Sequence, residues 1–137
     1  MGALIAPETL KQHLESIGTK LEKSPGTFLF RRGDEGAGVF LVSQGKIRLG
    51  LERDPRGFPS RTLGPGSVVG LPATLSRSPY SLTAEVLEDS ELVFVPDAKL
   101  LSLLRDKPEL CFDVMNILTE ELTQTRIALE HVRKTTC

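Results

Sequence analysis

Histidine and cysteine are the side chains most often used to bind metals and haem, and this 137-residue chain holds two of each. His13 and His131 lie near opposite ends, and neither belongs to a Glu-x-x-His or other paired-ligand pattern. Cys111 and Cys137 stand 26 residues apart with no Cys-x-x-Cys motif, which argues against an iron–sulfur cluster or a disulfide framework. We therefore expect no metal, haem or iron–sulfur site.

A glycine-rich segment at residues 33–38 (Gly-Asp-Glu-Gly-Ala-Gly) has the composition of a phosphate-binding loop. It lacks the Lys-Ser/Thr pair that follows in such loops and does not lead into a helix, so we interpret it as a hairpin turn. The chain also offers no Ser/His/Asp or Cys/His constellation, and no carboxylate pair in a catalytic context. The sequence therefore does not predict an enzyme.

The charge balance points away from nucleic acid. The chain has 17 basic and 18 acidic side chains and a net charge of -1, whereas nucleic-acid-binding domains carry a basic excess on one face. We expect no direct DNA binding by this chain. Residues 1–6 show no basic leader, and no apolar run reaches the length of a membrane span. We expect a cytoplasmic protein with reduced thiols and no membrane contact.

These side chains must be positioned by one domain, spanning residues 1–137. Residues 7–23 are predicted to form an N-terminal helix, since Pro7 suits a first helical turn and Leu10, Leu14, Ile17 and Leu21 recur at helical spacing. Gly18 lowers the helix propensity and marks a place where that helix could end.

Residues 24–96 have a different pattern. Short apolar runs alternate with glycine- and proline-bearing turns at 27–30, 38–42, 46–51, 62–63, 67–69, 81–86 and 91–95. Strands at this spacing predict an antiparallel sandwich or jelly roll. Residues 97–135 return to helical patterns: Asp97 is a suitable N-cap, and Pro108 suits the first turn of a longer helix. The expected fold is therefore mainly β, a jelly-roll-like β-roll with flanking helices.

Three segments carry a resemblance to a known family. Residues 26–36 (Gly-Thr-Phe-Leu-Phe-Arg-Arg-Gly-Asp-Glu-Gly), 39–49 (Val-Phe-Leu-Val-Ser-Gln-Gly-Lys-Ile-Arg-Leu) and 63–70 (Leu-Gly-Pro-Gly-Ser-Val-Val-Gly) resemble, in order and spacing, the Crp/Fnr-type cyclic-nucleotide-binding domain. The resemblance covers about residues 10–135. It implies a double-stranded β-helix with a long C-terminal dimerisation helix. Family members that regulate transcription continue into a helix-turn-helix domain, and this chain stops at Cys137, so we expect it to act on a protein partner or to be truncated.

The resemblance also implies a phosphate-binding cassette beginning at Gly70. In the family, a carboxylate that binds the ribose follows this glycine, and an arginine before a small residue pairs with the cyclic phosphate. Here those two positions hold Leu71 and Tyr80; only Gly70 and Ser81 match. Arg77 is an alternative arginine three residues away. Tyr80 has two interpretations, a hydrogen-bonding ligand contact or a ring that caps the pocket.

Without that arginine, strong cyclic-nucleotide binding is disfavoured. We expect the cassette to keep its shape with changed chemistry, and its cofactor or ligand stays unknown. The candidate ligand-binding residues are Gly70, Leu71, Ala73, Arg77, Tyr80, Ser81 and Leu82.

The long C-terminal helix carries two apolar stripes. Leu110, Val114 and Ile117 form one, which we expect to pack on the roll. The other has heptad spacing and is the predicted homodimer interface; it comprises Cys111, Met115, Leu118, Leu122, Thr125, Leu129 and Val132. The alternative is that both stripes serve one intramolecular core.

Together these features predict a regulatory or sensory binding module that senses a small ligand other than a cyclic nucleotide and acts as a homodimer through a protein partner. Two alternatives stay open: a ligand-free dimerising interaction module, and cyclic-nucleotide binding through different residues. An open apolar pocket would favour sensing. A pocket filled by Leu71, Tyr80 and Leu82 would favour the ligand-free module.

Overall fold

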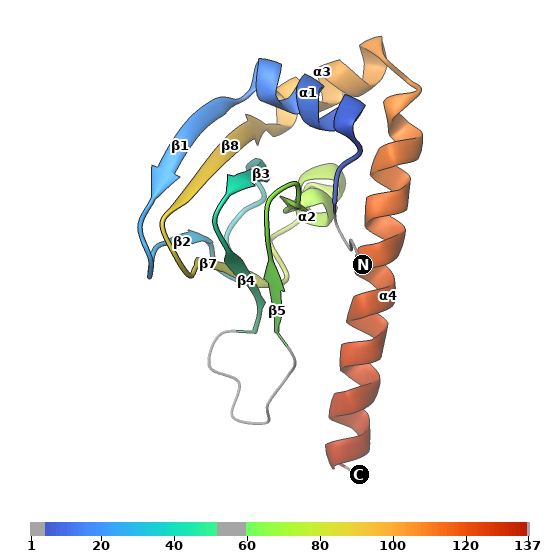
Figure 1. Cartoon of the computed structure of the whole chain (residues 1–137). Helices are drawn as coiled ribbons and strands as arrows, with labels where there is room; N and C mark the ends of the chain where they lie inside the picture. The colour runs from blue at the N-terminus through green and yellow to red at the C-terminus, as the bar shows by residue number, and fades with distance from the viewer. Residues whose placement is uncertain (1–4, 52–59, 137) are drawn as a thin grey trace.

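A computed structural model describes residues 5–51 and 60–136; from residue 124 onward most side chains lie outside the description. The fold is the predicted one, mainly antiparallel β with an N-terminal helix and a long C-terminal helix (Figure 1). In chain order the elements are α1 (Glu8–Ile17), β1 (Thr19–Lys23), β2 (Phe28–Phe30), β3 (Gly38–Gln44), β4 (Ile47–Gly50), β5 (Arg61–Leu63), β6 (Val68–Val69), α2 (Leu71–Ser76), β7 (Thr83–Val86), β8 (Ser90–Pro96), α3 (Asp97–Asp106) and α4 (Leu110–Thr136).

The strands form two four-stranded sheets, in the orders β1-β8-β3-β6 and β2-β7-β4-β5. Every pairing within them is antiparallel, and consecutive strands often lie in different sheets, as a β-roll requires. β3 is a central strand, and its residues 38–42 are all buried. One face of β3 lines the roll, and α1 and α3 pack against β3 and β8 (Figure 1). This double cover explains the continuous apolar run.

The predicted N-terminal helix over residues 7–23 was wrong for its last six residues. The helix ends at Ile17, and residues 19–23 form β1, which pairs with β8 and places Leu21 opposite Leu92. The reason is the close approach at Gly18: a Cβ atom there would lie 2.3 Å from Cγ1 of Val93 and 2.9 Å from the carbonyl oxygen of Phe94. The backbone is therefore extended at Gly18 and continues as β1, the antiparallel neighbour of β8. The helical spacing of Leu21 was coincidental.

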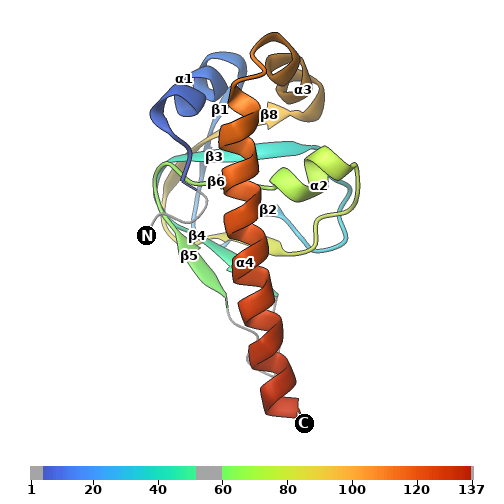
Figure 2. The same cartoon turned by 90° about the vertical axis from the view of Figure 1, so that its right-hand side faces the viewer.

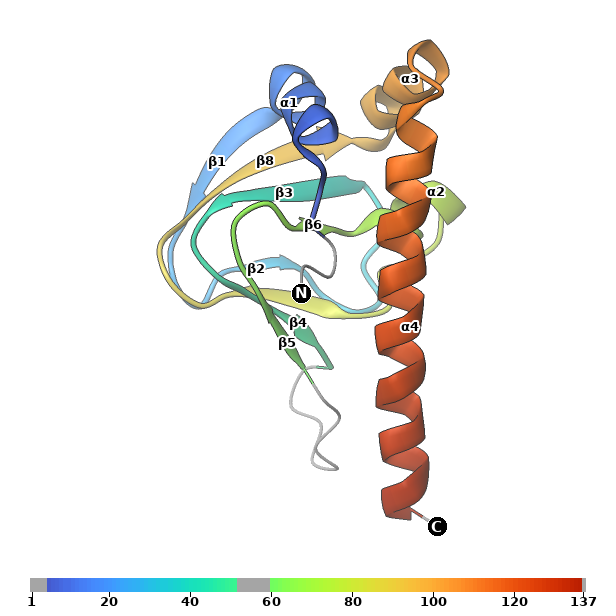
Figure 3. The same cartoon turned by 45° about the vertical axis from the view of Figure 1, so that its right-hand side comes forward.

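α4 runs alongside the roll, past the end where α2 lies, and its C-terminal part extends beyond the strands (Figures 2 and 3). The predicted inward stripe is confirmed, since Leu110, Val114 and Ile117 are all buried in the core. α4 therefore closes one side of the roll, next to the cassette that begins at Gly70.

Candidate functional site

The cassette is a compact structure from Gly70 to Leu82 at the end of the roll facing α4. Gly70 precedes α2 with a φ of 94°, a conformation that favours glycine. A Cβ atom at this position would lie 3.1 Å from the carbonyl oxygen of Gly38 and 3.2 Å from Cε1 of Tyr80. The glycine is thus needed both for its backbone conformation and for the close packing of the Tyr80 ring.

The hydroxyl group of Tyr80 is hydrogen-bonded inside the protein. The hydroxyl donates to the carbonyl oxygen of Gly38 at 2.7 Å and accepts from the amides of Ala37 and Gly38, both at 3.2 Å. The Tyr80 backbone is held as well, by hydrogen bonds at 2.8 Å with Gly33 and with Asp34. The phenol thus occupies the backbone donors of the segment at residues 37–38.

The Tyr80 ring also fills space. It stacks on Phe30 with ring centroids 3.9 Å apart and planes inclined by 9°, and only 5% of the residue is exposed. Beside the two rings remains a cavity of about 20 Å³, enough for a water molecule. Ligand pockets usually measure about 300–1,000 Å³. In this structure the Tyr80 ring fills the cassette, an arrangement that favours the second of its two interpretations, the ring that caps the pocket.

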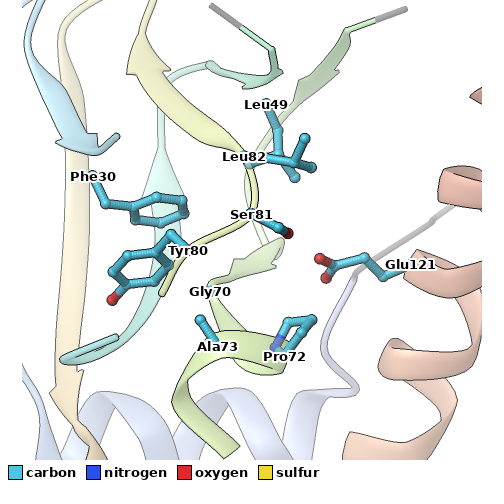
Figure 4. A pocket seen from close by; sticks show the side chains of 9 residues that line it. All are labelled: Phe30, Leu49, Gly70, Pro72, Ala73, Tyr80, Ser81, Leu82 and Glu121. Atoms are coloured by element: carbon cyan, nitrogen blue, oxygen red, sulfur yellow. The ribbon is translucent and has the colours of Figure 1, made fainter. Parts of the chain in front are cut away.

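The cavity gathers most of the predicted ligand-binding residues. Figure 4 shows its nine lining residues, which are Phe30, Leu49, Gly70, Pro72, Ala73, Tyr80, Ser81, Leu82 and Glu121. Leu71 is also buried but does not line the cavity; it packs in the core. Arg77 is exposed and lies in a separate groove with Glu35 and Asp97. The structure therefore does not place Arg77 as a substitute for the missing arginine.

Sequence reasoning missed Glu121, which comes from α4 and points across the cavity toward Ser81 (Figure 4). A signal was present: Leu110, Val114 and Ile117 follow one another by four and three residues, and the next inward position of this stripe is 121. The inward stripe therefore places a carboxylate where another apolar residue is expected. Phe30, which supports the Tyr80 ring, was missed as well.

Glu121 is only 9% exposed, and its Oε1 atom has no hydrogen-bond partner among the described residues. Burial raises the pKa of Glu121 to about 7, although the positive charge of Arg61 on β5 acts in the opposite direction. Nη2 of Arg61 is also buried without a hydrogen-bond partner in the described part of the chain. A carboxyl group and a guanidinium group therefore interact here, and each has a buried atom without a hydrogen bond among the described residues.

The residues that line the cavity disfavour the binding of an anion. None of the described residues lining it is lysine or arginine, and its one ionisable group besides Tyr80 is a carboxylic acid. A phosphate monoanion in this cavity would lie near the Glu121 carboxyl group without a cationic side chain among the lining residues. The described lining of the cavity therefore offers a phosphate no cationic side chain.

The predicted dimer seam divides between two environments. Met115 and Leu122 are 50% and 69% exposed, whereas Cys111 and Leu118 are half-buried at the edge of the roll. Phe112, absent from the prediction, is 68% exposed. The side chains of Thr125, Leu129 and Val132 lie outside the described residues.

Two features are absent from the described residues. None of their helices is both long enough and apolar enough to cross a membrane. Within the same part of the chain, no three His, Cys, Asp or Glu side chains are grouped to hold a metal ion.

Comparison with known proteins gives a consistent result. The family model described as "Cyclic nucleotide-binding domain" matches residues 20–107. The chain is 32% identical over 115 residues to the anaerobic regulatory protein of Bacillus subtilis, covering 82% of this chain and 48% of the relative. It is 30% identical over 129 residues to the cyclic AMP receptor protein of Thermus thermophilus, covering 92% and 58%. The chain thus spans about half the length of these relatives.

The structural comparison agrees with the sequence comparison. The crystal structure of the Thermus thermophilus catabolite activator protein superposes with a TM-score of 0.73 at 29% identity, covering 93% of this chain and 60% of that one.

Proposed function

Because this chain belongs to the cyclic nucleotide-binding domain family and is related to Crp/Fnr-type regulators, we propose that it is a non-catalytic regulatory module that dimerises without a cyclic nucleotide. The observation that carries this proposal is the filled cassette: Tyr80 stacks on Phe30 and its hydroxyl binds residues 37–38. Of the alternatives open from the sequence, the ligand-free dimerising module is the one that this geometry favours.

The proposed dimer contact is the outer face of α4. Phe112, Met115 and Leu122 are exposed and follow one another by three and seven residues, so they lie on one face of the helix. Burying large apolar side chains in a helix pair is the usual source of such association. We define this set as the outer stripe. A module of this kind acts through a protein partner, and the cytoplasmic location expected from the sequence stays a prediction.

Sedimentation velocity on three proteins tests the proposal. The wild type is expected to sediment as a dimer without added nucleotide, and cyclic AMP is expected to leave its distribution unchanged. Leu122→Glu places a charge in the outer stripe and is expected to raise the dimer dissociation constant at least about tenfold, equivalent to about 1.4 kcal/mol. Ser102→Glu, an exposed position of α3, adds the same charge elsewhere and is expected to have no effect.

A monomeric wild type would contradict the dimer proposal. So would equal weakening by Leu122→Glu and Ser102→Glu, because the outer stripe would then have no special role.

A second candidate is the sensing of a small ligand other than a cyclic nucleotide. The unpaired Oε1 atom of Glu121 beside the cavity favours it. Such a ligand would have to displace the Tyr80 ring, since the present cavity takes only a water-sized occupant. Native mass spectrometry of the purified chain tests this: a bound small molecule would favour sensing, and the bare mass would favour the ligand-free module.

A further inference from the structure

The contact between α4 and β5 contains an ionisable pair that a core of this size does not need for packing. Glu121 lies on the inward face of α4, one turn beyond Ile117, which is buried. Arg61 is the first residue of β5, whose next-but-one residue, Leu63, is in the core. An apolar residue at position 121 would complete the inward stripe, so the carboxyl group calls for a physical explanation.

The two groups are near enough to interact but are not hydrogen-bonded. Each is the first-named opposite charge acting on the other. Yet Oε1 of Glu121 and Nη2 of Arg61 are both buried with no partner among the described residues. A buried carboxylate without a hydrogen bond costs several kcal/mol, so an unpaired Glu121 is stable only as the neutral acid. The arrangement seen here suits that neutral form.

A charged Glu121 would need a partner, and among the described residues the cation that acts on it is Arg61. Glu120 on α4 is acidic and also acts on Arg61. The cavity side contributes the Ser81 hydroxyl and Tyr80, whose hydroxyl is already bonded to residues 37–38. β5 contributes Arg61, which stays charged at all physiological pH values. A hydrogen-bonded pair with Arg61 requires the two side chains to rearrange, because Oε1 of Glu121 and Nη2 of Arg61 have no hydrogen-bond partner here among the described residues.

We propose that Glu121 and Arg61 form a proton-operated contact between α4 and β5. When protonated, Glu121 faces the cavity beside Ser81 as a neutral acid. When the proton leaves to solvent, the carboxylate turns to Arg61 and ties the middle of α4 to β5. The transition falls near neutral pH, where the carboxyl of Glu121 titrates. The next residue on α4, Leu122, belongs to the outer stripe, so the contact lies where it can alter the helix face used for association. This contact works within one chain and does not depend on the dimer or on nucleotide binding.

Carbon-13 NMR of the glutamate carboxyl groups tests the proposal on the intact chain. The Glu121 resonance is assigned as the one that disappears in Glu121→Gln. Its midpoint is expected at about 7. In Arg61→Gln the midpoint is expected to rise further, by roughly half a unit or more, because the charged form loses its partner. Arg48→Gln is the matched control, since Arg48 on β4 pairs with Glu85 instead; it is expected to leave the Glu121 midpoint unchanged.

A Glu121 midpoint near 4.5, as in an exposed glutamate, would overturn the proposal. Equal midpoints in Arg61→Gln and Arg48→Gln would do the same, because Arg61 would then not be the partner of the charged form.

Hydrogen exchange provides a second measurement that does not require Arg61→Gln to fold. In the wild type, the protection of β5 and of residues 110–123 is expected to differ between pH 6 and pH 8 after correction for the intrinsic rates. Glu121→Gln is expected to abolish that difference. An unchanged wild-type pattern, or a difference that persists in Glu121→Gln, would overturn the proposal.

Discussion

The two sides of the cassette cavity are built in opposite ways. On one side, Tyr80 has its ring stacked on Phe30 and its hydroxyl bonded to residues 37–38. On the other lies Glu121, whose Oε1 atom is buried without a hydrogen-bond partner among the described residues, as is the Nη2 atom of nearby Arg61. Burial alone does not distinguish them, since both Tyr80 and Glu121 are at least nine-tenths buried. The difference is in hydrogen bonding: the Tyr80 side is closed, and the Glu121 side is able to change with conditions.

Tyr80→Ala is expected to have the largest effect, because it empties the closed side. Removing a buried aromatic side chain costs about 3–5 kcal/mol of unfolding free energy, and this one also leaves the amides of residues 37–38 without their partner. Urea denaturation measures the loss. Ser81→Ala, an exposed neighbour, is the control and is expected to change stability by no more than about 0.5 kcal/mol. A Tyr80→Ala variant as stable as Ser81→Ala would show that the cap is not part of the fold's stability.

The pH dependence of stability addresses the other side. The pKa of Glu121 is raised in the folded chain, from 4.5 to about 7, so its contribution is fully present below pH 4.5 and is lost as the pH rises through 7. The wild type is therefore expected to lose about 3 kcal/mol between those limits, with no further loss from this group above them. Glu121→Gln is expected to remove this slope in urea denaturation at several pH values. A slope that is unchanged in Glu121→Gln would assign the titration to another group.

Tyr80→Phe separates the hydroxyl of the cap from its ring. The ring stays on Phe30, and the hydrogen bonds to Ala37 and Gly38 are lost. Leaving buried backbone groups unpaired costs about 1–3 kcal/mol. The loss of stability is therefore expected to be smaller than in Tyr80→Ala. Equal losses in both variants, measured in parallel urea titrations, would mean that the hydroxyl contributes all of the effect and the stacked ring none.

Arg77→Ala is expected to have the smallest effect. Arg77 is exposed in a separate groove, away from both sides of the cavity. Its removal is expected to change the free energy of unfolding by less than about 0.5 kcal/mol, as measured by urea denaturation. A large destabilisation would indicate that Arg77 turns into the cassette after all.

The strands and the inward stripe of α4 could be predicted because their signals are local: alternation, turn residues and helical spacing. Residues 19–23 could not, since the close approach of Gly18 to Val93 decides their structure and depends on a strand seventy residues later. The resemblance located Gly70, Tyr80 and Ser81 in one site but left open what Tyr80 does. Its role depends on Phe30 and on the backbone of residues 37–38, distant in sequence.

Glu121 shows a different limit. Its position on the inward face follows from helical spacing, but its meeting with Ser81 and Arg61 depends on how α4 lies across the roll. Met115 and Leu122 were predicted in the heptad seam and are exposed, while Phe112 was missed because it falls outside strict heptad spacing.

Calorimetric titration of the wild-type chain with cyclic AMP and cyclic GMP tests most directly whether the family's cassette has lost its original ligand here. With Tyr80 in place of the arginine and Glu121 facing the cavity, we expect no saturable binding tighter than about 1 mM, which corresponds to about -4 kcal/mol. Micromolar binding of either nucleotide would contradict that conclusion, because it would require Tyr80 to leave Phe30 and a cation to enter the site.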